Sequence, residues 1–150
     1  MVIIMKNNKP TIYLLLTIIL TAFIFSNSCQ TATVSSEQSG RIVGFISSLF
    51  QFDTHILTVI VRKLAHIFEF FLQAVSASLF VISIKGFPKH TIYVLFAGLM
   101  TACCDEFIQL FFDGRGSMVA DIFIDFSGTL LGILLCGTVY FIILKKNKSI

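Results

Sequence analysis

Apolar residues along this chain gather in four long stretches, at about residues 11–28, 57–84, 91–112 and 119–144. A helix that crosses a bilayer needs about 20 mostly apolar residues. Each stretch approaches or exceeds that length. The segments 85–89 and 113–117, which separate the last three stretches, combine glycine or proline with charged residues. The pattern predicts an all-α integral membrane protein in which residues 1–150 form one domain, a four-transmembrane-helix bundle.

The segment between the first two spans has a different pattern. Residues 27–41 are rich in serine and threonine and are expected to form a polar linker. Residues 42–52 are apolar but too short to span, so we expect a short interfacial helix between helices one and two. The first span could instead be a signal peptide ending near Cys29. Because Ser26 stands where a lipoprotein cleavage site usually has leucine, we expect this helix to be retained.

Composition supports a membrane environment. The chain is 56% hydrophobic and 13% charged, whereas a soluble domain carries about 25% charged residues. Its net charge of +3 is too small to indicate a nucleic-acid partner. The four cysteines lack metal-site spacing, so their expected role is that of small apolar residues.

Basic residues divide unevenly between the two ends of the predicted spans. With the N-terminus placed inside, the inner side holds Lys6, Lys9, Lys85, Lys89, Lys145, Lys146 and Lys148. The outer side then holds Arg41, Arg62, Lys63 and Arg115. Because loops rich in lysine and arginine stay in the cytoplasm, the excess on the inner side predicts that both termini are cytoplasmic. All eight acidic residues then fall in outer loops or in the outer halves of helices.

Polar residues within the last three spans form stripes. The second span carries Arg62, His66, Glu69 and Gln73 at helical spacing, with Lys63 beside them. The third carries Asp105, Glu106 and Gln109, and the fourth carries Asp121 and Asp125, continued by Gly128 and Gly132. A charge at the bilayer centre costs at least about 2.5–3.5 kcal/mol. We therefore expect the stripes to face one another around a polar pocket open to the outside, with the glycines letting the fourth helix pack tightly below it.

These residues and their spacing resemble the VanZ-like family of membrane proteins. The similar segments are 62–69 (RKLAHIFE), 105–109 (DEFIQ), Gly114-Arg115, and Asp121 with Asp125 and Gly128. Residues 25–30 are loosely similar to the family's ending of the first helix. Phe70, Ile108 and Asp113 stand where the family often has other residues. The resemblance implies a multi-pass protein of the bacterial cytoplasmic membrane, and it implies an association with teicoplanin resistance.

Two functions are compatible with this pattern. In the first, a non-catalytic module binds or shields a cell-envelope molecule, either a lipid-linked cell-wall precursor or another anionic membrane lipid. Arginine binds phosphate and carboxylate bidentately, so the cations would contact the ligand while the acids hold them in place. The candidate ligand-binding residues are Arg62, Lys63, His66, Glu69, Gln109, Arg115, Asp121 and Asp125.

In the second, the protein is a membrane-embedded enzyme acting on a lipid head group. A divalent metal could activate water there, or an acid and a histidine could perform acid–base catalysis. Metal-ligand candidates are His66, Glu69, Asp105, Glu106, Asp121 and Asp125, and catalytic candidates are His66, Glu69, Asp105 and Glu106. A structural reading is also open, in which Arg62 pairs with Glu69 and Arg115 with Asp121. We favour the non-catalytic function because no recognised catalytic motif such as His-Glu-x-x-His is present.

Overall fold

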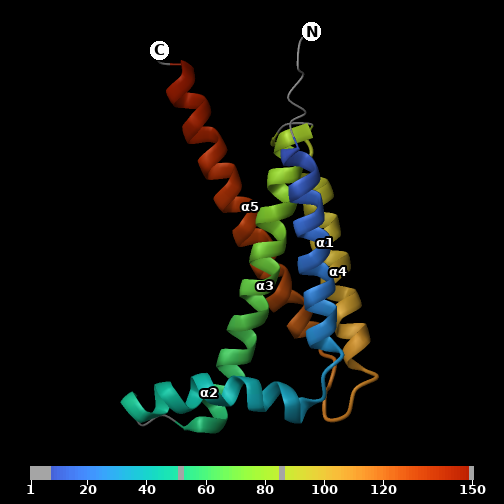
Figure 1. The fold of residues 1–150 in the computed structure, drawn as a ribbon, viewed down its shortest axis with the longest axis vertical. Helices are drawn as coiled ribbons and strands as arrows, with labels where there is room; N and C mark the ends of the chain where they lie inside the picture. Colours follow the sequence, from blue (N-terminus) through green and yellow to red (C-terminus); the bar gives the residue numbers. More distant parts are fainter. Residues whose placement is uncertain (1–7, 51–52, 85–86, 149–150) are drawn as a thin grey trace.

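A computed structural model describes residues 8–50, 53–84 and 87–148, and all regular elements in these ranges are α-helices. In chain order they are α1 (Lys9–Ser28), α2 (Ala32–Phe50), α3 (Thr54–Ile84), α4 (Thr91–Gln109) and α5 (Val119–Lys148) (Figure 1). Helices α1, α3, α4 and α5 are long and apolar enough to cross a membrane. The predicted all-α fold with four candidate spans is confirmed.

Helix α3 is the central element, since it contacts each of the other four helices. Helices α1 and α4 run beside it, whereas α5 crosses α3 and then diverges from the bundle toward its own C-terminal end (Figure 1). The start of α1 and the end of α5 lie at one end of the bundle. Helix α2 and the loop between α4 and α5 lie at the opposite end.

Helix α2 lies crosswise to the bundle, as expected for an interfacial helix, but its predicted limits were wrong. It begins at Ala32 rather than near residue 42, so most of the predicted linker at residues 27–41 is helical. Residues 51–52, the predicted end of this helix, lie outside the described residues. Helix propensity is a weak guide here because tertiary contacts override it. The Ala32 N–H donates to the carbonyl oxygen of Asp113 at 3.1 Å, and Val43 is buried.

The third span is shorter than the apolar pattern suggested. We expected it to reach about residue 112, but α4 ends at Gln109 and residues 110–112 form a turn. The N–H groups of Phe111 and Phe112 donate to the carbonyl oxygens of Ile108 and Gln109 in this turn. The chain then returns across the end of the bundle to the start of α5. Part of the other predicted break, residues 85–86, lies outside the described residues.

Two glycines fix the closest helix contact. A Cβ atom added at Gly128 would overlap the carbonyl oxygen of Ile67, and one added at Gly132 would lie 2.7 Å from that of Phe71. Helix α5 therefore rests directly on the α3 backbone at both positions. The predicted close packing by these glycines is confirmed.

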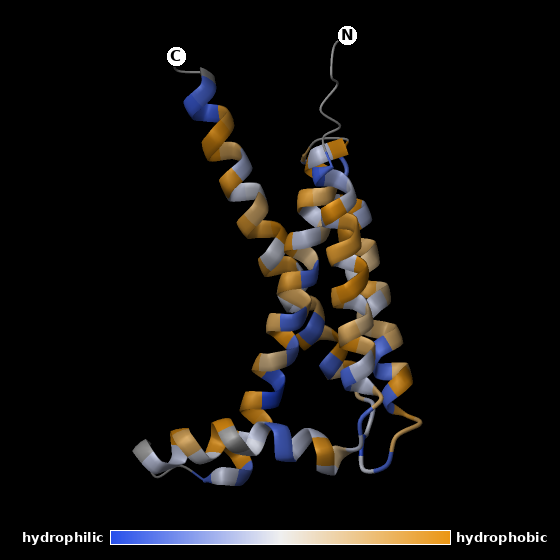
Figure 2. Ribbon diagram, viewed as in Figure 1, coloured by the Kyte–Doolittle hydropathy of each residue, from blue (hydrophilic) through white to orange (hydrophobic). Residues whose placement is uncertain are grey.

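Apolar side chains on the outside of the bundle are widely exposed. Ile18, Phe96 and Leu134 are 56%, 66% and 64% exposed. Hydrophilic residues lie in α2, in the loop after α4 and in the adjoining ends of the long helices, and also at the C-terminal end of α5 (Figure 2). The exposed apolar surface fits lipid as the solvent of the outside of the bundle.

Candidate functional site

Three side chains from different helices meet at the polar end of the bundle. His66 of α3 places its Nδ1 3.4 Å from Oδ1 of Asp125 on α5 and 3.8 Å from Oδ2 of Asp105 on α4. Asp105 is 0% exposed and Asp125 is 2% exposed. We call these three residues the acid–histidine cluster. Residues from the three predicted stripes therefore do meet.

Asp105 is held by hydrogen bonds at both of its oxygens. The hydroxyl of Ser28, in the last turn of α1, donates to Oδ1. The Nε2 of Gln109, one turn further along α4, donates to Oδ2 at 2.8 Å. The carboxylate cannot rotate without losing one of these bonds, so its orientation toward His66 is fixed by two helices.

The stripe on α3 continues into the bundle through two further polar residues. Glu69 accepts a hydrogen bond at Oε1 from the Nδ2 of Asn27, at 2.8 Å. The Nε2 of Gln73 donates to the hydroxyls of Thr21 and Thr101, at 2.7 and 3.2 Å. Buried polar groups require such partners. These bonds therefore tie α1 and α4 to α3 just beneath the cluster.

Glu106 acts at the start of α5. Its Oε2 accepts the backbone N–H of Met118 at 2.9 Å, next to the first residue of that helix. The first N–H groups of a helix lack partners within it, and a negative charge near them is favourable. Glu106 is 2% exposed. It thereby positions α5 and is not part of the acid–histidine cluster.

One ion pair lies beside the cluster. The Nζ of Lys63 is 2.9 Å from Oδ1 of Asp121. Both residues lie about one turn from the cluster on their own helices, so α3 and α5 face each other here as well. Within the described part of the chain, the considered pairs of Arg62 with Glu69 and of Arg115 with Asp121 do not form.

The loop after α4 carries Arg115 to the site. Gly114 precedes it with a φ of 74°, a backbone conformation that glycine adopts without strain. The Nη2 of Arg115 donates to the carbonyl oxygen of Asn27 at 3.0 Å. Its Nε and Nη1 are buried and have no hydrogen-bond partner among the described residues. Burial, and then the neighbouring charge of Arg62, lower the pKa of the Arg115 guanidinium from its usual value.

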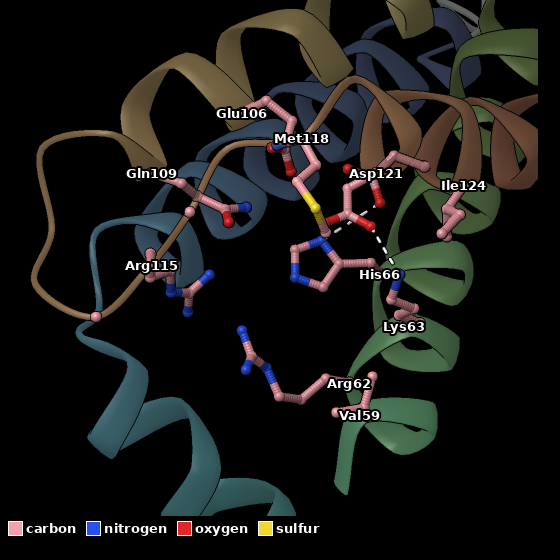
Figure 3. Close-up of a pocket in the computed structure, with 13 residues that line it drawn as sticks. Val59, Arg62, Lys63, His66, Glu106, Gln109, Arg115, Met118, Asp121 and Ile124 are labelled. Atoms are coloured by element: carbon pink, nitrogen blue, oxygen red, sulfur yellow. Dashed lines mark hydrogen bonds and ion pairs between the residues drawn. The ribbon is translucent and has the colours of Figure 1, made fainter. Parts of the chain in front are cut away.

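Arg62 extends from α3 toward Arg115, and Figure 3 shows their guanidinium groups facing each other across a pocket. The Nε of Arg62 is also buried without a hydrogen-bond partner in the described residues. Both positive side chains therefore line the same space. The arrangement offers a bidentate site for an anion.

Two cavities adjoin these arginines. The larger, about 210 Å³, is lined by both guanidinium groups, by His66 and Asp125, and by Lys63 and Asp121. The smaller, about 150 Å³, lies beneath α2 and is lined by amides and hydroxyls from Asn27, Gln30, Ser35, Gln38 and Ser39. Arg62, His66 and Arg115 line both cavities. These three residues therefore form a shared wall between them.

The candidate metal ligands divide into two groups. His66, Asp105 and Asp125 each offer a ligand atom within 4.8 Å of the others. The other three have different partners: Glu69 accepts a hydrogen bond from Asn27, and Glu106 accepts one from the N–H of Met118. Asp121 forms an ion pair with Lys63. Among the candidate ligand-binding residues, Gln109 orients Asp105 and also lines the larger cavity.

Asn27 and Ser28 were not predicted as site residues. They end α1 and bond to Glu69 and Asp105. In sequence they lie at the start of what reads as a polar linker, where side chains are usually solvated. The loose similarity of residues 25–30 to a family pattern is the signal that could have identified them.

Comparison with known proteins identifies the family of the chain. Residues 12–143 match the sequence profile of the family described as VanZ/LLP1, which covers most of the chain, from the first candidate span into the last. Searches of the curated proteins and of the solved structures found no match. The chain therefore belongs to the VanZ/LLP1 family, and its four long apolar helices make it a multi-pass membrane protein of that family.

Proposed function

We propose that the polar pocket binds the phosphate-bearing head group of a lipid-linked cell-envelope molecule. The observation that carries this proposal is the facing pair of guanidinium groups, Arg62 and Arg115, with buried N–H donors that lack partners in the described residues. Two positive groups held this close repel each other, and an anion between them would offset that repulsion. Phosphate suits the site because its oxygens can accept from both guanidinium groups at once.

The two cavities support a ligand with more than a phosphate. Arg62 and Arg115 line both cavities. A ligand whose phosphate lies between them could therefore extend into either cavity. The amides and hydroxyls under α2 suit a head group that carries hydroxyls, such as a sugar or a polyol. The wide apolar surface of the surrounding helices suits the lipid chain. A lipid-linked cell-wall precursor combines these features.

We further propose that the protein lies in the bacterial cytoplasmic membrane with both termini in the cytoplasm and the pocket facing outward. The excess of lysines near the ends supports this orientation. A reporter that works only in the cytoplasm, fused after Ile150, should be active. A silent cytoplasmic reporter combined with an active reporter of the periplasmic type would reverse the orientation.

Lipid binding can be measured directly on purified protein in nanodiscs. The probes are a polyprenyl phosphate and the matching polyprenol, which lacks the phosphate. We expect the phosphate form to bind more tightly. Arg62→Ala and Arg115→Ala should each weaken its binding by about 10- to 100-fold, because a hydrogen bond to a charged group contributes about 1.5–3 kcal/mol.

Lys145→Ala is the matched control, since it removes an exposed positive charge at the opposite end of the bundle. It should leave polyprenyl phosphate binding unchanged. Equal binding of the phosphate and the alcohol, or equal affinity of the parent and both arginine variants, would contradict the proposal.

Shielding of such a molecule would also affect a drug that acts near the bilayer. We propose that overexpression in a susceptible Gram-positive host raises tolerance to teicoplanin, a lipid-tailed glycopeptide, more than tolerance to vancomycin. The double variant Arg62→Ala/Arg115→Ala should lose this effect at equal expression. Unchanged susceptibility of cells with confirmed expression would exclude a role in tolerance.

A second candidate function is that of an enzyme acting on the same head group. The observation that favours it is the position of His66 and Asp125 on the wall of the larger cavity, beside the arginines. A polyprenyl diphosphate incubated with the protein should then release phosphate, and His66→Ala should stop the release. Binding of polyprenyl diphosphate without release of phosphate would support the non-catalytic function.

A further inference from the structure

The acid–histidine cluster carries more negative charge than its neighbours balance. Asp105 and Asp125 are both buried, and within the described ranges no lysine or arginine forms an ion pair with either of them. If His66 is neutral the three residues carry a charge of −2, and if it is protonated they carry −1. A buried charge that lacks a partner is costly, and the low dielectric of a membrane protein interior increases the cost.

One oxygen of the cluster also lacks a partner. The Oδ2 of Asp125 is buried and accepts no hydrogen bond from any described residue. The other acid differs, because Ser28 and Gln109 occupy both oxygens of Asp105. Asp125 itself is 2% exposed, so bulk water does not replace the missing bond. A cation beside this carboxylate would satisfy the unpaired oxygen.

The donor atoms of the three residues lie within 4.8 Å of one another, close enough to bind one metal ion. We propose that His66, Asp105 and Asp125 bind a divalent transition-metal cation such as Zn²⁺ or Mn²⁺. Zinc binds nitrogen and carboxylate oxygen at about 2.0–2.2 Å, so two ligands at the tetrahedral angle lie about 3.4 Å apart. The Nδ1 of His66 is 3.4 Å from Asp125 Oδ1 and 3.8 Å from Asp105 Oδ2.

The residues around the cluster support the same assignment. Ligands in metal sites are usually oriented by further hydrogen bonds. Ser28 and Gln109 provide these for Asp105 from two helices. One imidazole with two carboxylates favours zinc or manganese over calcium, which prefers six to eight oxygens. A +2 ion would also cancel the charge of both acids with neutral His66.

The metal would have free coordination positions on the pocket side. His66 and Asp125 line the larger cavity, so the site is reached from the space between Arg62 and Arg115. A water or a phosphate oxygen could complete its coordination there. The inference does not rest on the proposed lipid binding, since the three ligands and their hydrogen bonds belong to the protein alone.

The test uses full-length protein, purified in detergent without chelator and with its affinity tag removed. Metal content is measured first, and the stripped protein is then titrated with Zn²⁺ and Mn²⁺. We expect about one ion per chain and a thermal stability that rises with added metal. Co²⁺ should give a visible d–d absorption band typical of nitrogen and oxygen ligands, a readout that requires no variant. A stripped protein that binds none of the three ions overturns the proposal.

Variants then assign the ligands. Asp125→Asn and His66→Ala should abolish binding of one Zn²⁺ per chain, and Gln109→Ala should weaken it by about 10- to 100-fold. Asp113→Asn is the control, since Asp113 is exposed in the loop after α4 and lines neither cavity. It should bind Zn²⁺ as the parent does. Equal zinc affinity of the parent, Asp125→Asn and His66→Ala would place the metal elsewhere and overturn the assignment.

The result is separable from that of the lipid assay. Loss of metal binding in Asp125→Asn with intact arginines tests the cluster, whereas loss of phosphate binding in Arg62→Ala tests the pocket. Stripped protein that still prefers polyprenyl phosphate over polyprenol supports the pocket without the metal. Zinc bound by a protein that shows no such preference supports the metal without the pocket.

Discussion

The two halves of α5 are both apolar, but they contact different surroundings. In the first half, Asp121, Asp125 and Gly128 face α3. In the second half the helix diverges from the bundle, and Leu134 and Ile142 are 64% and 62% exposed (Figure 1). The first half therefore packs directly on the α3 backbone, whereas the second half keeps protein contacts on one face, where Phe87 lies against Tyr140 and Phe141, and exposes the other face.

The difference shows which residues specify the arrangement of helices in a membrane. Lipid tails are as apolar as leucine, so burying leucine between helices provides little driving force. The driving force comes instead from small residues, which permit backbone contact, and from polar residues, which need partners. Helix α5 has both kinds in its first half, and this is where it rests on α3.

The largest effect is expected where α5 touches the α3 backbone. Gly128→Leu places a side chain against the carbonyl oxygen of Ile67, which cannot move without displacing α3. Overpacking destabilises a tight contact, and here the α3 backbone would have to shift because no flexible side chain can yield instead. We expect the variant to lose the folded bundle, as measured by yield and by size-exclusion chromatography in detergent.

Gly44→Leu is the matched control, because no atom lies within 4 Å of a Cβ added there. It introduces the same side chain into helix α2 without a clash and should purify like the parent. Normal folding of Gly128→Leu would show that the close contact does not fix the helix arrangement.

A smaller effect is expected in the acid–histidine cluster. Asp125→Ala removes the acid nearest to His66, so the imidazole loses this partner, and it also removes one of the three proposed metal ligands. Breaking a buried pair costs about 3–5 kcal/mol, mostly from the partner left behind. The melting temperature in detergent should fall clearly. Asp113→Ala, in an exposed loop position, should leave it unchanged.

The sequence predicted the fold because length and hydropathy determine spanning helices almost alone. The sequence also predicted that the polar stripes on α3, α4 and α5 face one another, because polar residues deep in a membrane must turn toward each other. It could not show that Asp121 pairs with Lys63 and not with Arg115, since that choice depends on the path of the loop after α4. It also missed Ser28, whose role appears only when α1 is packed against α4.

A weaker coupling is expected between Lys63 and Asp121. Their 2.9 Å ion pair is partly exposed, and such pairs contribute about 0.2–1 kcal/mol. Lys63→Ala and Asp121→Ala should each lower thermal stability slightly, and the double variant should lose less than the sum of the two. Strict additivity would show that the pair does not contribute to the contact between α3 and α5.

The smallest effect is expected in the diverging half of α5. Leu134→Ala shortens a side chain that is 64% exposed, and a lipid or detergent tail can fill the space that the side chain leaves. Surface substitutions away from special features usually change stability by less than about 0.5 kcal/mol, so the melting temperature should match that of the parent. Ile133→Ala, at the neighbouring buried position that is 8% exposed, should lower it because a cavity remains between packed helices. If Leu134→Ala were the more destabilising change, the outward face of α5 at Leu134 would have to be covered by protein and not by lipid.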